Sequence, residues 1–243
     1  MDELIKKFKE LNMKSCLENI ESVMERAVKE NLPPLKIIHH LLDLELERRK
    51  RNRIELRFKQ SKLYEKPTID QFDFNHHVSR TRQKNLILDL LSMEFIPRKK
   101  DIILIGNPGV GKSFIAKALA YAATQAGVKT LFITAMDMIN HLISAEADRT
   151  LLKKLQTYQS PDLLVIDEIG YLSLGEAGSH LFFQVISQRH ERKSTIITTN
   201  LPFKDWGKIF ESTTVATAIA DRLVSNSEVL ILEGESYRKR KNK

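Results

Sequence analysis

A glycine-rich motif at the centre of the chain constrains the fold more than any other feature. Its residues are Gly106, Asn107, Pro108, Gly109, Val110, Gly111, Lys112 and Ser113, which match G-x-x-x-x-G-K-[ST] at every fixed position. The apolar run 101–105 before it is typical of a buried strand, and residues 113–120 after it have apolar residues at helical spacing. A strand, a glycine loop and a helix start in this order predict a P-loop in an α/β fold.

The chemistry of this motif favours a bound nucleotide. Glycines let successive backbone N–H groups converge, and the following helix start adds positive potential, so the loop can cradle phosphates. We expect Lys112 to reach the β- and γ-phosphates, Ser113 to ligate Mg²⁺, and Phe114 to complete the nucleotide-binding segment. The alternative, a glycine turn without a ligand, is disfavoured by a second motif.

That second motif places two carboxylates at the end of an apolar run. Residues 163–166 predict a central parallel strand, and Asp167 and Glu168 follow at its carboxyl end, where ligands bind in open α/β sheets. We expect Asp167 to hold Mg²⁺ and Glu168 to act as the general base that polarises the attacking water. A further strand ends at Asn200, which points at the γ-phosphate if its strand neighbours the P-loop strand, and is otherwise a strand-ending turn residue.

The pattern of elements divides the chain into three parts. Residues 1–63 predict a small all-helical domain, 64–78 a linker that Phe72 and Phe74 anchor on the next domain, and 79–243 an ATPase domain with a short basic tail. We expect a helix from Ser79 to Phe95. Five strands are expected in the last part, at 102–105, 129–134, 163–167, 194–199 and 228–232. Right-handed crossovers would stack them into a parallel sheet covered on both faces.

Charge and composition narrow the partners. The net charge of +8 is concentrated: from residue 48 to 62 there are eight basic residues against Glu55, and the chain ends in a second basic cluster. Such charge favours a polyanion, most often nucleic acid, although a solvated helix face is the common alternative. No apolar run long enough to span a membrane, no signal peptide and no cysteine pair is present, which favours the cytoplasm and no membrane contact. We expect Cys16, the single cysteine, to be buried.

The P-loop, the Asp-Glu strand and the run Thr198-Thr199-Asn200-Leu201-Pro202 together resemble the IstB-like branch of the AAA+ ATPases, helper proteins of bacterial insertion sequences related to DnaC-type helicase loaders. The resemblance covers about residues 64–238. It implies an AAA+ fold without a C-terminal helical lid, a sensor role for Asn200, and an arginine finger, Arg222, that reaches the nucleotide of a neighbouring subunit. It also implies that Arg238 contacts the nucleotide as a second sensor.

The resemblance further implies an ATPase that uses ATP and Mg²⁺ to assemble as a homo-oligomer on double-stranded DNA, and that recruits and stimulates a transposase. The candidate DNA contacts are Arg48, Arg49, Arg51, Arg53, Arg57, Lys153 and Lys154.

Four other functions compete with this interpretation. A DnaC-like loader of a replicative helicase would share the fold and the ATP chemistry. A P-loop kinase is disfavoured by Glu168 and by the lack of a substrate-binding insertion, and a GTPase by the lack of an Asn-Lys-x-Asp signature. A switch that holds ATP without turnover stays open.

Overall fold

The computed structural model describes residues 2–237 and divides the chain into two compact units, Met1–Leu56 and Arg57–Lys243. The division lies inside the helix α3 (Pro34–Gln60), whereas the sequence predicts the end of the helical domain near residue 63.

The first unit is helical, as the apolar periodicity predicts. It contains α1 (Asp2–Glu10), α2 (Lys14–Lys29) and most of α3. Its core is small, and the buried apolar side chains in it are Cys16, Ile20, Val23 and Leu41. Cys16 is fully buried, as expected, and its thiol donates to the Leu41 carbonyl at 3.2 Å.

A buried carboxylate fixes α2 against α3. The Glu45 carboxylate accepts from the Ser15 N–H (2.9 Å) and from Arg49 Nε (2.8 Å), and Arg48 lies within 3.9 Å. It thereby satisfies an N–H group in the first turn of α2, whose own N-cap residue, Met13, supplies no side-chain bond. Burial works against the charged form, but the bonds from Arg49 and the Ser15 N–H hold the pKa of Glu45 below its ordinary value.

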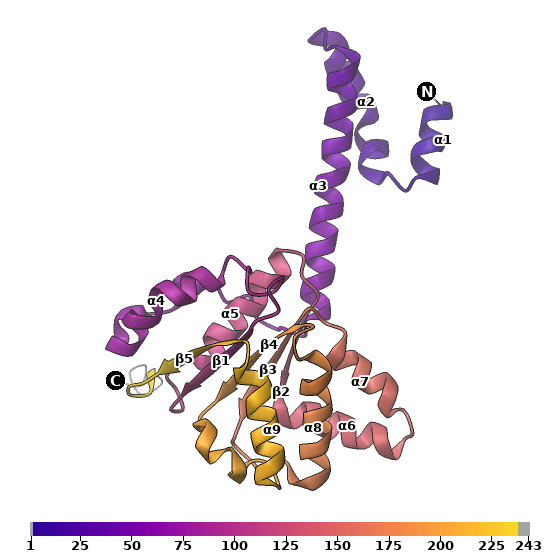
Figure 1. Cartoon of the computed structure of the whole chain (residues 1–243). Helices are drawn as coiled ribbons and strands as arrows, with labels where there is room; N and C mark the ends of the chain where they lie inside the picture. Colours follow the sequence, from indigo (N-terminus) through magenta and orange to yellow (C-terminus); the bar gives the residue numbers. More distant parts are fainter. Residues whose placement is uncertain (1, 238–243) are drawn as a thin grey trace. The chain divides into compact units, whose positions relative to one another are not determined.

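The second unit begins with the last turn of α3 and continues as alternating helices and strands (Figure 1). Two short 3₁₀ turns, η1 (Ile69–Gln71) and η2 (Phe74–His76), precede the first helix of this unit. The helices are α4 (Val78–Leu90), α5 (Lys112–Gln125), α6 (Ala135–Ala147), α7 (Leu151–Gln159), α8 (Gly175–Arg189) and α9 (Thr213–Val224), with the turn η3 (Phe203–Lys208). The strands are β1 (Asp101–Gly106), β2 (Thr130–Thr134), β3 (Leu163–Ile169), β4 (Ser194–Thr199) and β5 (Ser227–Leu232).

The five strands form one parallel sheet in the order β2-β3-β4-β1-β5, which confirms the predicted fold class. Strand β4 pairs with β1 through Ile102↔Ile196 to Ile105↔Thr199, and with β3 on its other side. The strand before Asn200 therefore neighbours the P-loop strand, which is the condition that the sequence left open. All the carboxyl ends meet at one edge of the sheet, where the site lies.

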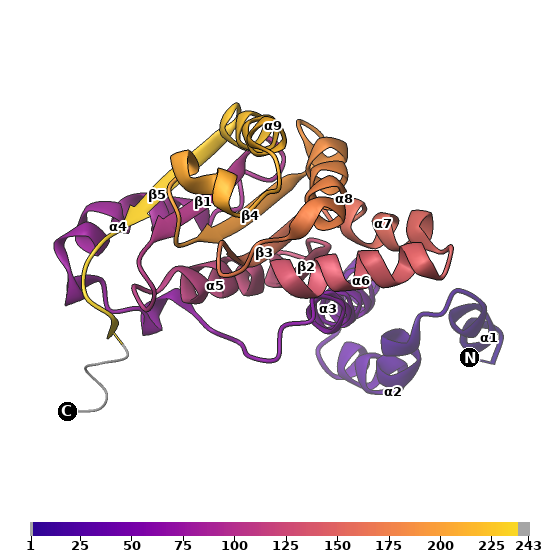
Figure 2. The same cartoon turned by 90° about the horizontal axis from the view of Figure 1, so that it is seen from below.

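Helices cover both faces of the sheet, as Figure 2 shows, and successive residues of each strand face opposite layers. On one face, Ile102, Leu104 and Val165 pack with α4 and α5. On the other, Ile103, Leu164 and Ile166 pack with α6, α7, α8 and α9. The central strands β1 and β3 are buried on both faces, which explains the continuous apolar runs 102–105 and 163–166.

Two details of the ATPase unit bear on the sequence predictions. Helix α4 ends at Leu90, not at Phe95, and its N-cap is His77, whose ring accepts from the Ser79 N–H, so the predicted cap at Ser79 is wrong by two residues. The described residues after β5, 233–237, contain no α-helix, in agreement with the predicted lack of a lid. None of the helices described, in either unit, has the length and apolar character needed to cross a bilayer.

Candidate nucleotide-binding site

The P-loop connects β1 to α5 at the carboxyl edge of the sheet. Gly111 has a left-handed φ of 102° and directly precedes α5, whose first turn no side chain of the described residues caps. The free N–H groups of that turn and the helix dipole face the loop, which makes this end of α5 an anion site.

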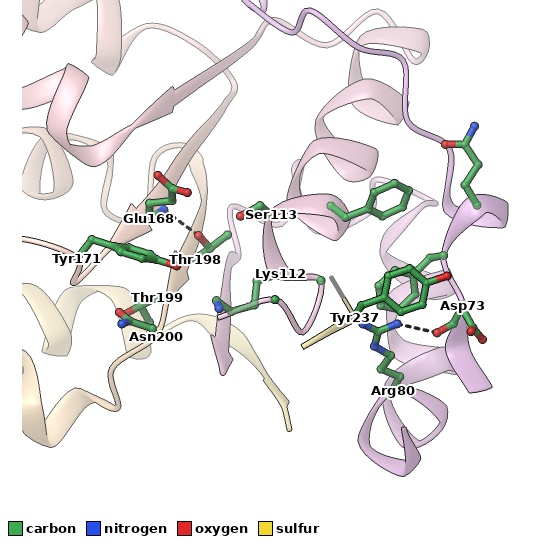
Figure 3. Close-up of a pocket in the computed structure, with 15 residues that line it drawn as sticks. Asp73, Arg80, Lys112, Ser113, Glu168, Tyr171, Thr198, Thr199, Asn200 and Tyr237 are labelled. Carbon is green, nitrogen blue, oxygen red and sulfur yellow. Dashed lines mark hydrogen bonds between the residues drawn. The ribbon is translucent and has the colours of Figure 1, made fainter. Parts of the chain in front are cut away.

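A cavity of about 440 Å³ opens beside the loop (Figure 3). Lys112 and Ser113 lie between two groups of side chains in this view, one containing Glu168, Tyr171 and Asn200. The other contains Asp73, Arg80 and Tyr237. The described residues that line the cavity are Gln71, Phe72, Asp73, Arg80, Gly109, Gly111, Lys112, Ser113, Phe114, Glu168, Tyr171, Thr198, Thr199, Asn200 and Tyr237. Of the predicted loop residues, Gly106, Asn107, Pro108 and Val110 do not line it.

Oxygen atoms from three elements meet at the end of β3. The Ser113 hydroxyl donates to Asp167 Oδ1 at 2.9 Å, and the Thr198 hydroxyl from β4 donates to the same oxygen. Asp167 is buried, so the fold and not solvent holds its carboxylate in place. A hydroxyl and a carboxylate on one spot are hard oxygen ligands that fit Mg²⁺.

Glu168 points away from the buried strand, into the cavity. Its backbone has a left-handed φ of 64°, which is uncommon for a residue other than glycine, and its N–H donates to the Thr198 hydroxyl at 2.9 Å. The left-handed turn directs Glu168 outward while Asp167 stays buried one residue earlier. Two adjacent carboxylates thus have different environments.

Asn200 lies across the cavity from Lys112 at the end of β4. Its Oδ1 is buried and finds no hydrogen-bond partner among the described residues. Gly170 allows this approach, because a Cβ at that position would lie 2.7 Å from Asn200 Oδ1 and its φ is 102°. Lys112 is buried, and its Nζ donates to the carbonyls of Gly106 (2.7 Å) and Asn107 (2.9 Å).

The residues that line the linker side of the cavity belong to neither sequence motif. Phe72, the predicted anchor, is buried and stacks on Phe114 with ring centroids 5.9 Å apart, so the anchor is also part of the cavity. Arg80 is only 2% exposed, and burial is the main cause that lowers the pKa of its guanidinium. Arg80 belongs to no sequence motif that would distinguish it from the many other lysines and arginines of the chain. Only the fold brings it to the cavity.

One predicted nucleotide contact, Arg222, is not among the described residues that line this cavity. Arg222 lies on α9, where its guanidinium donates to the Ala218 carbonyl (2.9 Å) and lies 4.7 Å from the Phe183 ring centre. A residue that acts on a neighbouring subunit is expected to lie outside its own chain's site. Arg238 is outside the described residues.

The predicted DNA-contact residues differ in their surroundings. Arg48 and Arg49 lie beside Glu45. This acidic partner precedes residue 48, so the count of charges over residues 48–62 does not include it. Arg57 belongs to the second unit and donates to the Gly127 carbonyl at 3.2 Å. Arg51 and Arg53 are exposed and form no ion pair with another described residue; Lys153 is exposed and Lys154 half-buried.

In this parallel sheet, β4, which is followed by Asn200, lies between the P-loop strand β1 and the strand β3 that carries Asp167 and Glu168. This arrangement defines a P-loop NTPase of the AAA+ class. The family model for IstB-like ATP binding proteins matches residues 6–243, and the chain belongs to this family. It is thus an ATP-binding protein.

Relatives of the chain come from insertion sequences. It is 37% identical over 233 residues to the "Insertion sequence IS5376 putative ATP-binding protein" of Geobacillus stearothermophilus, covering 96% of this chain and 92% of that protein. It is 36% identical over 238 residues to the "Insertion sequence IS21 putative ATP-binding protein" of Pseudomonas aeruginosa, covering 98% and 89%.

Among solved structures, the DnaC helicase loader has a TM-score of 0.61 at 24% identity, covering 70% of this chain and 99% of that one. AMPPCP-bound DnaA from Aquifex aeolicus has a TM-score of 0.60 at 19% identity, covering 74% and 56%. These likenesses concern the fold.

Proposed function

We propose that this chain is an ATPase that assists DNA transposition. It assembles with ATP on double-stranded DNA, and it recruits and stimulates a transposase. The observation that carries the ATPase part is the junction of Ser113, Asp167 and Thr198, with Glu168 and Asn200 beside it. The insertion-sequence relatives support the transposition part.

In this proposal the phosphates of ATP lie on the P-loop. Lys112 exchanges the carbonyls of Gly106 and Asn107 for β- and γ-phosphate oxygens. Ser113 and Asp167 would hold Mg²⁺, which when bound neutralises charge on those phosphates.

Hydrolysis then needs an oriented water. Glu168 accepts a proton as the water attacks the γ-phosphorus, and the bond to the ADP oxygen breaks. The unpartnered Oδ1 of Asn200 supplies a second acceptor for that water. In the assembly, Arg222 of a neighbouring copy neutralises the transferring phosphoryl group, and Arg238 contacts the nucleotide of its own chain.

The DNA-binding part rests on charge. Arg51 and Arg53 are the best placed of the proposed contacts because they are exposed and lack ion pairs among the described residues; Arg48, Arg49, Arg57, Lys153 and Lys154 are secondary. Contacts to phosphates would make binding salt-dependent and largely independent of sequence.

The first test is binding to a long fluorescent duplex with ATP, with ADP and without nucleotide, together with particle size. Cooperative binding and large particles with ATP alone are expected. Weak binding by a monomer, equal in all three conditions, would contradict ATP-driven assembly.

A DnaC-like helicase loader is the second candidate, favoured by the match to 99% of the DnaC structure. Mixing the ATP-bound protein with purified transposase or with replicative helicase separates the two. Stimulated strand transfer supports the first function, and delivery of helicase onto DNA supports the second.

A further inference from the structure

Two consecutive carbonyl groups of the P-loop are held by residues that lie outside the motif. The backbone N–H of Tyr237 donates to the Gly109 carbonyl at 3.0 Å. Arg80 donates through Nη2 to the Val110 carbonyl and through Nη1 to the Asp73 carbonyl, both at 2.9 Å. Figure 3 shows Arg80 and Tyr237 together on one side of Lys112.

The geometry of the peptide bond gives these two contacts a consequence. A planar trans peptide directs its C=O and its N–H to opposite sides. Holding the Gly109 carbonyl therefore turns the Val110 N–H away from Tyr237, and holding the Val110 carbonyl turns the Gly111 N–H away from Arg80. Successive N–H groups that face one side form an anion-binding concavity. A glycine-rich loop without these contacts would populate many other orientations.

The surroundings of Arg80 are built to hold its guanidinium still. The group lies 4.6 Å from the centre of the Phe72 ring and 5.2 Å from that of Tyr237. Its planar fork donates to two carbonyls in different segments at once, which the single ammonium of a lysine does poorly. Its Nε is buried and has no hydrogen-bond partner among the described residues, which is unfavourable. The fold nevertheless keeps the charged guanidinium in this buried place, where it holds the loop.

The terminal strap, residues 233–237, is fixed to the same helix. The Ser79 hydroxyl donates to the Glu233 carbonyl (2.8 Å) and accepts from the Glu233 N–H (2.9 Å). Gly109 allows the strap to approach the loop closely, because a Cβ at this position would lie 2.1 Å from Ser236 Oγ and its φ is 83°. The start of α4 thus carries both supports of the loop.

We propose that Arg80 and the backbone N–H of Tyr237 are positioning groups that preorganise the P-loop for the phosphates of the nucleotide, whatever its base. The proposal rests on the placement of phosphates on the P-loop given above. It assigns a role to the terminal strap: it takes part in phosphate binding in a protein whose described residues include no helical lid after β5.

The test uses inorganic tripolyphosphate, which has no base, as a competitor of a fluorescent ATP analogue on the full chain. Arg80→Lys keeps the charge and loses the fork, and we expect it to weaken tripolyphosphate and ATP by the same factor, about tenfold or more. Arg82→Lys, an exposed change on the same helix, is the control and should bind as the unmodified chain does. Thermal unfolding checks that both variants are folded.

Two results for Arg80→Lys would overturn the proposal. Arg80→Lys could bind tripolyphosphate normally, which would mean that charge alone suffices. It could weaken ATP alone, which would assign Arg80 to the base. In either case, loss of tripolyphosphate binding in Lys112→Ala would leave the proposed ATP site intact and remove only this inference. If Lys112→Ala also binds normally, the placement of phosphates fails and the inference falls with it.

A second pair of variants isolates the contribution of the backbone N–H of Tyr237. Tyr237→Pro and Tyr237→Ala both lose the ring, but only proline also lacks the N–H that donates to Gly109. We expect Tyr237→Pro to bind tripolyphosphate about threefold to tenfold more weakly than Tyr237→Ala, the usual effect of one hydrogen bond. Equal affinities would show that the strap does not position the loop.

Discussion

The helical unit and the ATPase unit are stabilised to very different degrees. In the first, the buried cluster has four apolar side chains, and several leucines of α3 are exposed, among them Leu35, Leu42 and Leu46. In the second, each face of the sheet has its own much larger buried cluster. Since stability follows buried apolar area, the ATPase unit carries most of it, and the helical unit depends on a few polar contacts.

The difference extends to function. Every described residue that lines the nucleotide cavity lies in the second unit: on the P-loop and the start of α5, at or just after the ends of β3 and β4, at the start of α4, or in the linker and the terminal strap. The first unit offers exposed charge and exposed leucines on α3. We therefore expect changes in the second unit to affect chemistry and global stability, and changes in the first to affect association.

The largest expected effect tests whether chemistry is confined to the ATPase unit. Glu168→Gln should lower ATP turnover about 10²- to 10⁴-fold, since it removes the proposed base, while ATP affinity stays near that of the unmodified chain. Phosphate release and equilibrium binding measure the two quantities. The matched control in the first unit, Arg51→Gln, should leave turnover without DNA unchanged. Normal turnover in Glu168→Gln would mean that another group is the base.

The second prediction compares the two cores. Leu119→Ala, at a fully buried position of α5, should lower the free energy of unfolding by about 2–5 kcal/mol. Leu42→Ala, at a position 43% exposed on α3, should change it by less than about 0.5 kcal/mol. Denaturant unfolding followed by circular dichroism measures both. A large loss in Leu42→Ala would show that a partner surface covers this leucine in solution.

The third prediction concerns the polar contact on which the helical unit depends. Glu45→Gln should destabilise this unit by about 1–3 kcal/mol because Arg49 and the Ser15 N–H lose a charged acceptor. The pKa of Glu45 is lowered in the fold, so its contribution is fully present above the ordinary value of 4.5 and is lost as pH falls through the folded pKa.

The measurement for Glu45 is thermal unfolding of the first unit's helices between pH 3 and pH 7, within the full chain. The unmodified protein and Glu45→Gln should differ near neutrality and converge in acid. An equal difference at every pH would show that the charge on Glu45 contributes nothing.

The smallest expected effect concerns DNA. Arg51→Gln and Arg53→Gln should each weaken duplex binding modestly and lower the slope of log affinity against log salt by about 1. Titrations at several salt concentrations in the presence of ATP measure this slope. Arg49→Gln serves as the comparison, since Arg49 is engaged with Glu45. If only Arg49→Gln weakened duplex binding, Arg49 and not Arg51 or Arg53 would be the DNA contact.

Much of the fold follows from local patterns. The five strands lie within two residues of the predicted ranges, because each contains a short run of β-branched and other apolar residues; in β1 and β3 this run is continuous. The end of α4 is less well predicted, since the residues after Leu90 form turns although Leu91, Met93 and Phe95 are apolar. Burial there comes from packing against the sheet, not from helix formation.

The sequence by itself determined the P-loop, the acidic strand end and the polar end of β4, because each is a contiguous run whose chemistry depends on neighbours in the chain. Only the tertiary structure decided that β4 lies between β1 and β3, that Glu45 neutralises the start of the basic stretch, and that Arg80 and Tyr237 hold two carbonyls of the loop. Those contacts join residues as far as 128 positions apart, from Gly109 to Tyr237. A local sequence pattern cannot predict such contacts, because each joins segments that are brought together only when the whole chain folds.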